Sequence, residues 1–551
     1  MNSAGTRSAL VPVLLCALGL LYLLGIEEHD LWTPDEPRVA SVGRQVAEGA
    51  WVVPTLNGKP FLEQPPLHAW CVALLYKVIG FDPALRARWI SVAFGLAGLA
   101  VIHGLATFLA SRRVGLLTAL TLGLSFEYFS TAHRVVVDGA LAFFTLLSVY
   151  SCLRGITADA LAARLGWLAL GYASASAAFL TKGPVGIAVP ALSVIAWAIA
   201  TRDLKVFARA HLWLAPVAFA VTAGPWLWAL FEQTGWEGFK TLLGDNLVGR
   251  VLPPAEEGTR SHLRGPLFYF AALPVNLLPA TAFVVGGAID RIRRRKILDP
   301  VERRLYDFGF VWLALGFTMF TAASTKRYIY LLPILPAAAL PGGLWLDLYL
   351  SGKADGAYEK CFGHILSIAI LLFALALAVS GALLEGVSTP LAVSGAVIPG
   401  VIALWMLRQA RSGRRSALLT VWLAGFTVAV LAASYTLVPA FDAIKSLTGV
   451  TRRVAALVPT ERPICALGAD ETTRGMFPLY TGRPLRMLDD AQGLEAELRQ
   501  SGEVYLLVTE KRGRRHRAMD LLDSHPSKLL HEDIRKGSRA FRLYRLYSSR
   551  P

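Results

Sequence analysis

The sequence predicts an α-helical polytopic membrane protein with about thirteen transmembrane helices and a small soluble α/β domain at its C-terminal end. Hydrophobic residues make up 54% of the 551 residues, charged residues make up only 17%, and the mean hydropathy is +0.49. An ordinary soluble fold cannot bury so much apolar surface. The apolar residues gather into runs of about 20, the length that crosses roughly 30 Å of hydrocarbon. After residue 438 the composition becomes mixed and charged.

The predicted spans follow one another through residues 1–438, the predicted transmembrane domain. They cover residues 10–26, 89–110, 114–130, 135–153, 166–180, 184–200, 211–231, 266–289, 308–324, 328–346, 365–384, 389–407 and 416–438. The first run is followed by Glu27, Glu28 and His29, where a cleaved signal peptide would have small residues. We therefore expect this run to stay in the protein as a membrane anchor.

The excess of basic residues is explained by the orientation of the spans. Lys and Arg number 55 against 39 Asp and Glu, which gives a net charge of +16. With the N-terminus in the cytoplasm, every second loop is short and basic, and residues 291–304 form the densest of them. The long loops at residues 27–88 and 232–265 are then external, as is the C-terminus. No nucleic-acid partner is expected.

One apolar segment, residues 66–80, is not counted as a span. It is short and contains His68 and Lys77. Counting it would reverse all later loops and place every basic cluster outside, against the positive-inside pattern. We expect this segment to form an interfacial helix that lies along the outer surface of the membrane.

The first long loop is predicted to open with a helix. Thr33 is the expected N-cap, Pro34 takes the first helical position, and Glu36 completes a capping box. Asp35 and Arg38 then share one face of the helix, three residues apart. The acidic pair Asp35 and Glu36 is a candidate for catalysis, although capping of a surface helix alone also explains it.

The rest of this loop is predicted to contain a hairpin. The helix is expected to run to about Gly49, and Asn57-Gly58 between extended segments favours a two-residue turn. Residues 63–66, Glu-Gln-Pro-Pro, follow just before the interfacial segment.

Residues 439–551 are predicted to form the α/β domain. Three runs have the composition of β-strands, at residues 464–469, 504–510 and 539–547. A segment of this size is within the range of a single small domain.

Further charged residues map to span ends and turns on the outer side. Asp138 lies just inside the fourth span, where it faces either the headgroups or a wet cavity. Lys182 lies in the turn after the fifth span and could simply snorkel to the interface. Lys326 and Arg327 lie in the turn before the tenth span. They are either topological anchors or binding groups, and they lie on the outer side, where basic anchors are fewest. Glu63 and His262 are the most plausible external metal pair, although a lone His is usually not a ligand.

Eight candidate residues all map to the outer side of the membrane in the predicted topology, and this coincidence is the main argument for a site. The residues are Asp35, Arg38, Glu63, Asp138, Lys182, His262, Lys326 and Arg327. Cations around a membrane-level cavity would neutralise charge on the oxygens of a departing lipid-linked phosphate. A carboxylate would orient or deprotonate the attacking group.

Four stretches resemble the GT-C membrane glycosyltransferases. They are DLWTPDEPRVA to LNGKPFLEQPPLHAW (residues 30–70), HRVVVDGALAFF (133–144), FLTKGPVG (179–186) and STKRYIYLLPILPAA (324–338). The similarity is to the branch that includes the bacterial aminoarabinose transferase of lipid A and the dolichyl-phosphate-mannose-protein mannosyltransferase-like group. It covers most of residues 10–350.

The resemblance implies a GT-C fold and transfer of a sugar from an undecaprenyl monophosphate carrier to a periplasmic acceptor, with inversion at C1. Lipid A is the expected acceptor and the bacterial inner membrane the expected location, with the active site and the C-terminal domain in the periplasm. The chain is expected to act as a monomer. Where this chain has Gln64, relatives commonly have Lys, so the aminoarabinose donor and the lipid A acceptor are less secure than the reaction class.

The expected site residues fall into three groups. The catalytic candidates are Asp35, Asp138 and Glu36. The candidates for binding substrate phosphate are Arg38, Lys182, Lys326, Arg327, Tyr328 and Gln64. The candidates for holding a metal, zinc by the resemblance, are Glu63 and His262.

Two kinds of rival remain open at this point. A flippase or transporter of lipid-linked sugars would share the lipid carrier but form no bond. Another GT-C enzyme would act on a different envelope glycan or on protein, or would use a diphosphate carrier. The number of phosphates on the carrier distinguishes the last of these.

Overall fold

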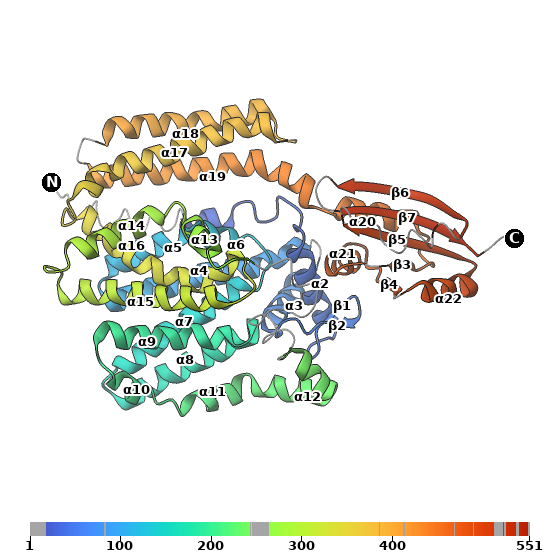
Figure 1. The fold of residues 1–551 in the computed structure, drawn as a ribbon, viewed down its shortest axis with the longest axis horizontal. Helices are drawn as coiled ribbons and strands as arrows, with labels where there is room; N and C mark the ends of the chain where they lie inside the picture. Colours follow the sequence, from blue (N-terminus) through green and yellow to red (C-terminus); the bar gives the residue numbers. More distant parts are fainter. Residues whose placement is uncertain are drawn as a thin grey trace. The chain divides into compact units, whose positions relative to one another are not determined.

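The computed structural model describes residues 18–81, 84–242, 244, 264–384, 386–410, 414–467, 469–488, 490–511, 522, 525–535 and 539–548. The chain divides into two compact units. The first unit contains Met1–Ile26, Leu62–His68 and Arg88–Pro439, and the second contains Glu27–Phe61, Ala69–Ala87 and Ala440–Pro551. Figure 1 shows the elements of both units with their labels.

The described part of the first unit is helical. Its elements are α4 (Arg88–Leu109), α5 (Arg112–Gly123), α6 (Phe126–Ala132), α7 (Asp138–Thr157), α8 (Leu161–Lys182), α9 (Val185–Thr201), α10 (Lys205–Arg209), α11 (Leu214–Thr222), α12 (Gly224–Phe239), α13 (Phe268–Leu277), α14 (Thr281–Arg293), α15 (Pro300–Ala322), η4 (Tyr328–Ile334), α16 (Leu335–Leu350), α17 (Ala357–Leu383), α18 (Thr389–Gln409) and most of α19 (Arg415–Lys445). The predicted runs from residue 89 onward each coincide with one of these helices or with a pair of them.

Three predicted runs are broken into helix pairs. The run at 114–130 is divided into α5 and α6, the run at 211–231 into α11 and α12, and the run at 266–289 into α13 and α14. The last two pairs are bent by 51° and 107°. Pro225 and Pro279 lie next to these bends, and a proline cannot donate the backbone hydrogen bond that would continue the preceding helix. A hydropathy pattern does not reveal such breaks.

Fewer than thirteen of the described helices are long and apolar enough to cross a membrane. Among the described residues, seven helices are long and apolar enough to cross a membrane, or up to nine if each bent pair is one span. Of the first run, residues 10–17 lie outside the described residues, and residues 18–23 are helical. Val185–Thr201 is apolar but has only 17 residues. The chain is thus a multi-pass helical membrane protein, and the figure of thirteen stays a prediction.

The most buried part of the first unit is η4 together with α16. Almost all of Tyr328–Leu350 is buried. A Cβ on Gly343 would lie 2.5 Å from the Cα of Thr118, and one on Gly287 would lie 2.7 Å from the carbonyl oxygen of Pro341. Because α5 and α14 approach α16 this closely, small residues let the helix backbones touch, as is typical of membrane bundles.

The second unit joins part of the first loop to the C-terminal segment. Its elements are α2 (Asp35–Ala47), β1 (Thr55–Leu56), β2 (Lys59–Pro60), α3 (Leu67–Ile79) from Ala69 onward, η1 (Ala84–Ala87), α20 (Thr448–Leu457), β3 (Ile464–Leu467), α21 (Glu471–Thr481), β4 (Leu485–Leu488), α22 (Ala491–Ser501), β5 (Glu503–Lys511), β6 (Ser527–Arg535) and β7 (Arg539–Tyr547). The order of the main sheet is β4-β3-β5-β7-β6; β3 pairs in parallel with β4 and β5, and β7 pairs antiparallel with β5 and β6. The three predicted strand runs are confirmed as β3, β5 and β7.

Both faces of this sheet are covered. One apolar cluster joins Ile464 and Leu507 to Phe477 of α21, and a second joins Cys465 and Leu506 to Leu494 of α22. Successive strand residues point to opposite faces, which is why neighbouring positions fall into different clusters. The sheet is therefore an internal layer with helices on both sides.

The hairpin prediction is confirmed, whereas the predicted start of the first helix is wrong in detail. β1 and β2 pair antiparallel, and Asn57 and Gly58 both have positive φ, 55° and 74°, as a type I′ turn requires. The first helix begins at Asp35, with Pro34 in place of Thr33 as N-cap and no side-chain cap hydrogen bond. The Thr33 hydroxyl instead donates to the carbonyl of Lys445 at 3.0 Å. A contact more than 400 residues away thus overrides the local capping pattern.

Candidate functional site

A buried ion pair joins two helix ends in the first unit. Asp138 is the first residue of α7, and Lys182 is the last residue of α8. The Lys182 Nζ lies 2.5 Å from Asp138 Oδ1, and the two side chains are only 13% and 8% exposed. Because α7 and α8 pack closely as consecutive helices, the start of one meets the end of the other. A carboxylate at a helix N-terminus and a cation at a C-terminus also suit the helix dipoles.

Aromatic residues complete this polar end of the first unit. The Lys182 Nζ lies 4.3 Å from the centre of the Tyr330 ring, a cation–π contact. Tyr269 is fully buried and interacts electrostatically with both Asp138 and Tyr330. Tyr330 and Tyr269 were not predicted from the sequence. Tyr330 could have been found as the second tyrosine of the KRYIY stretch.

The predicted phosphate-binding stretch Lys326 to Tyr328 has mixed exposure. Lys326 is only 5% exposed, and its Nζ donates to the carbonyl of Ala323 at 2.5 Å. Arg327 is half-buried. Tyr328 is 49% exposed, and its ring packs against Phe268. The tyrosine that contacts the Lys182 ammonium is Tyr330, two residues after this stretch.

Two further polar groups near Asp138 were missed as site candidates. Glu127 in α6 is 5% exposed, is bound by Arg134 at 2.6 Å, and interacts electrostatically with Asp138. His68 at the start of α3 is 1% exposed, and neither ring nitrogen has a hydrogen-bond partner among the described residues. Burial lowers the pKa of His68 to about 4, and the Asp138 carboxylate partly opposes this effect.

The other group of predicted residues lies on α2 in the second unit. Arg38 donates to Asp35 Oδ1 at 3.1 Å, so the predicted shared face is confirmed, and it also pairs with Glu471. The side chains of Asp35 and Arg38 are 20% and 15% exposed. Glu36 is buried and accepts a hydrogen bond from the Trp32 backbone N–H at 2.8 Å. This contact gives Glu36 a structural role in the turn before the helix.

The predicted metal ligands form no complete site among the described residues. Glu63 and Gln64 belong to the first unit and are half-buried, and His262 lies outside the described residues. No group of three or more His, Cys, Asp or Glu side chains there could hold a metal ion. The part of the chain that the structure describes therefore supplies one predicted zinc ligand, Glu63, and we derive no catalytic step through a metal.

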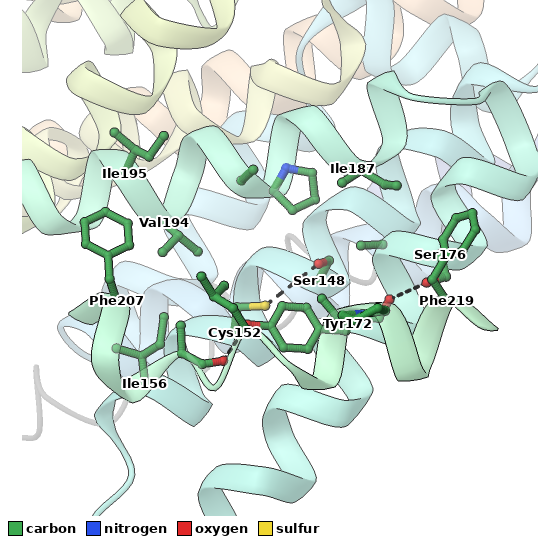
Figure 2. Close-up of a pocket in the computed structure, with 17 residues that line it drawn as sticks. Ser148, Cys152, Ile156, Tyr172, Ser176, Ile187, Val194, Ile195, Phe207 and Phe219 are labelled. Carbon is green, nitrogen blue, oxygen red and sulfur yellow. Dashed lines mark hydrogen bonds between the residues drawn. The ribbon is translucent and has the colours of Figure 1, made fainter. Parts of the chain in front are cut away.

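An apolar cavity of about 500 Å³ opens between α7, α8, α9, α10 and α11 (Figure 2). Its few polar lining groups include Ser148, Cys152 and Tyr172; the Cys152 thiol is directed toward Ser148, and the Tyr172 hydroxyl donates to the carbonyl of Ala210. Cys152 lies 14 residues after Asp138 along α7, which is roughly 21 Å along the helix axis. The lining suits hydrocarbon, and its distance from Asp138 separates it from the polar end of the unit.

Parts of the chain are similar in sequence to known proteins. The model of the dolichyl-phosphate-mannose-protein mannosyltransferase family matches residues 63–228. The chain is 28% identical over 349 residues to an undecaprenyl phosphate-alpha-4-amino-4-deoxy-L-arabinose arabinosyl transferase of Aeromonas salmonicida, over 61% of this chain and 59% of the relative. It is 30% identical over 333 residues to a relative of the same name in Sodalis glossinidius, over 59% and 58% of the two chains. The chain thus matches less than two thirds of the length of these curated relatives.

The structural comparison extends over nearly the whole chain. The crystal structure of ArnT from Cupriavidus metallidurans bound to undecaprenyl phosphate superposes with a TM-score of 0.76, at 20% identity, over 97% of this chain and 98% of that one. The apo form of the same protein gives a TM-score of 0.75. At this level of identity the likeness establishes the fold. The chain therefore has the fold of this membrane protein, and it is similar in sequence to aminoarabinose transferases.

Proposed function

We propose that the chain is a membrane glycosyltransferase that moves a sugar from an undecaprenyl monophosphate carrier to lipid A, with 4-amino-4-deoxy-L-arabinose as the sugar. The observation that carries the proposal is the buried pair of Asp138 and Lys182 at the ends of two apolar helices. An intramembrane ion pair is costly, and such groups mark functional sites. The names of the sequence relatives support the choice of carrier and sugar.

The proposal includes the full predicted topology. Thirteen spans place the N-terminus in the cytoplasm and residues 27–88, residues 232–265 and the C-terminal segment in the periplasm, with α3 as an interfacial helix. The short, basic alternate loops support this orientation. The enzyme would act as a monomer in the bacterial inner membrane.

In the proposed reaction, an acceptor oxygen attacks C1 of the sugar and the bond from C1 to the carrier phosphate breaks, so that configuration inverts. Lys182, Lys326 and Arg327 would neutralise the phosphate that departs, with Arg38, Gln64 and Tyr328 as further contacts. A phosphate acceptor on lipid A is already ionised, and Asp35 then needs only to orient it. A hydroxyl acceptor would transfer its proton to Asp35 as general base. Asp138 would hold Lys182, and Glu36 would fix the start of α2.

The proposal also includes a zinc ion, with Glu63 and His262 as two of its ligands. Elemental analysis of the purified protein, with Glu63→Gln and His262→Ala compared with the wild type, tests this directly. Bound zinc that both substitutions remove supports the site, and zinc that neither removes rules it out.

The reaction is tested by sugar transfer in proteoliposomes that contain the lipid-linked aminoarabinose donor and lipid A. Asp35→Asn should lower transfer by at least about 100-fold, while the unfolding midpoint stays close to that of the wild type. Glu48→Gln, in the last-turn pair of the same helix with Arg44, is the control and should transfer normally. Normal transfer by Asp35→Asn would refute its role.

The same proteoliposomes separate an enzyme from a transporter. A flippase would move the lipid-linked sugar across the bilayer and leave lipid A unchanged. Mass spectrometry of lipid A and other envelope glycans, from cells with and without the protein, identifies the acceptor. An altered glycan or protein with unchanged lipid A would replace the acceptor and keep the reaction class.

A further inference from the structure

Helix α21 of the C-terminal segment contacts the start of α2, where the candidate catalytic residues lie. Arg38 forms an ion pair with Glu471, the first residue of α21. The Thr472 hydroxyl donates to the carbonyl of Pro34 at 3.4 Å. A Cβ on Gly475 would lie 2.9 Å from the Arg38 Cα, so the two helices approach each other nearly backbone to backbone.

The Arg38 guanidinium is held at two points. Its Nη2 donates to Asp35 and its Nη1 to Glu471. A planar guanidinium with both terminal nitrogens engaged has a fixed orientation. The Glu471 carboxylate therefore limits where Arg38, and through it the Asp35 carboxylate, can lie.

The far end of α2 is also attached to α21. Arg44 Nη1 donates to the carbonyls of Pro478 and Leu479, at 2.9 and 3.2 Å. The Pro478 carbonyl also accepts from the Gly482 N–H at 3.1 Å, and a cation near the last carbonyls of a helix suits the helix dipole. Contacts at both ends fix the direction of α2 as well as its position.

The hairpin after α2 forms a third attachment. The Asn57 side chain accepts from the Leu485 backbone N–H and donates to the Leu485 carbonyl, both at 2.8 Å, and Asn57 is only 7% exposed. This pair of hydrogen bonds engages both backbone groups of the first residue of β4. Arg474 also donates to the carbonyl of Leu56 at 3.4 Å.

Helix α21, which makes most of these contacts, is held rigidly. Asp470 follows β3 and caps α21, since its side chain accepts from the Thr473 N–H. Met476 and Phe477 of α21 are fully buried against the sheet. A helix capped directly after a central strand and packed on the sheet has little freedom to move.

From these contacts we infer that the C-terminal segment positions the Asp35 carboxylate, and that Glu471 is a positioning residue that acts through Arg38. The inference rests on the proposed function, in which Asp35 orients or deprotonates the acceptor. Displacement of a catalytic group by about 1 Å can lower a rate by roughly 100-fold. The segment thus contributes to catalysis without touching substrate.

The test uses the full chain in nanodiscs and two matched pairs of variants. Glu471→Gln removes one of the two carboxylates that bind Arg38. Its control is Glu495→Gln in α22, since the two side chains are equally exposed, at 47% and 46%, and Glu495 pairs with Arg499 of its own helix. Gly475→Ala inserts a methyl group against α2. Its control is Gly449→Ala in α20, where a Cβ would meet nothing within 4 Å.

The first readout is hydrogen–deuterium exchange of residues 35–47, which needs no enzyme activity. Glu471→Gln and Gly475→Ala should speed exchange there by about fivefold, and the two controls should leave it unchanged. Equal exchange in Glu471→Gln and Glu495→Gln would overturn the inference, whether or not the protein transfers sugar.

The second readout is transfer per folded molecule. Glu471→Gln should lower kcat by about tenfold with little change in the KM for the lipid-linked donor. The acid limb of its pH–rate profile should also move to lower pH, since Arg38 then no longer shares its charge with the Glu471 carboxylate. Faster exchange in α2 with an unchanged kcat and pH profile would also overturn the inference. Absence of transfer by the wild type would instead refute the proposed function.

Discussion

Lys182 Nζ lies 2.5 Å from Asp138 Oδ1 and so joins the end of α8 to the start of α7. Removal of one member of a buried ion pair leaves an uncompensated charge, which costs about 3–5 kcal/mol. We therefore expect Lys182→Met to lower the unfolding midpoint sharply and to abolish sugar transfer. The measurement is thermal unfolding in detergent together with the transfer assay.

The double variant Asp138→Asn with Lys182→Met separates the structural role of this pair from the catalytic one. It should recover most of the lost stability, because no charge is then left unpaired, but it should not recover transfer. Arg499→Met is the control, since the exposed pair of Arg499 with Glu495, at 81% and 46% exposure, contributes at most about 1 kcal/mol. Recovery of transfer by the double variant would contradict a role in phosphate binding.

Lys326→Met should raise the KM for the lipid-linked donor by about tenfold, since a hydrogen bond to a charged group contributes about 1.5–3 kcal/mol. Lys326→Arg keeps the charge and should stay closer to the wild type. Lys296→Met, at an exposed position in the predicted cytoplasmic loop, serves as the control. The measurement is the initial rate of transfer as a function of donor concentration. An unchanged KM in Lys326→Met would exclude contact with the carrier phosphate.

Buried His68 should make the folded state acid-sensitive. Its pKa is about 4 in the folded protein and about 6.5 in the unfolded chain. The unfolded state therefore binds more protons as pH falls below about 6.5, and stability is lost between about pH 6.5 and pH 4, by at most roughly 3 kcal/mol. Unfolding midpoints measured across this range give the effect.

His68→Phe keeps an aromatic ring and removes the titration, so the midpoint should fall less steeply between pH 6.5 and pH 4. His364→Phe, at a half-buried position in α17, is the matched control. The explanation is excluded if the two variants show the same dependence on pH as the wild type.

Gly186 should be essential for the packing of α8 against α9. A Cβ at this position would lie 2.3 Å from the carbonyl carbon of Ala178, and insertion of a methyl group into such a contact costs about 1–3 kcal/mol. Gly186→Ala should therefore lower the unfolding midpoint. Gly166→Ala, where a Cβ would meet nothing within 4 Å, should raise it slightly, because alanine favours helix over glycine. Equal midpoints for both variants would contradict the close approach.

The local patterns of the sequence predicted elements well where the physical cause is local. Apolar runs predicted helices because each helix buries its own backbone hydrogen bonds in the bilayer, whatever its neighbours are. The hairpin followed from the positive φ that Asn57 and Gly58 accept readily. The shared face of Asp35 and Arg38 followed from helical spacing alone.

Only the tertiary structure decided the partners of these elements. Thr33 does not cap the first helix, because its hydroxyl donates to the Lys445 carbonyl instead. The ion pairs of Arg38 with Glu471 and of Lys182 with Asp138 join segments that lie far apart in the sequence. Tyr330, rather than Tyr328, meets Lys182 because the side that faces the core is set by the packing of η4 against α7. The sequence determines which segments become helices and strands, because backbone and solvent fix that locally. Which charges become neighbours depends on how those segments pack, because long-range contacts form only when the whole chain has folded.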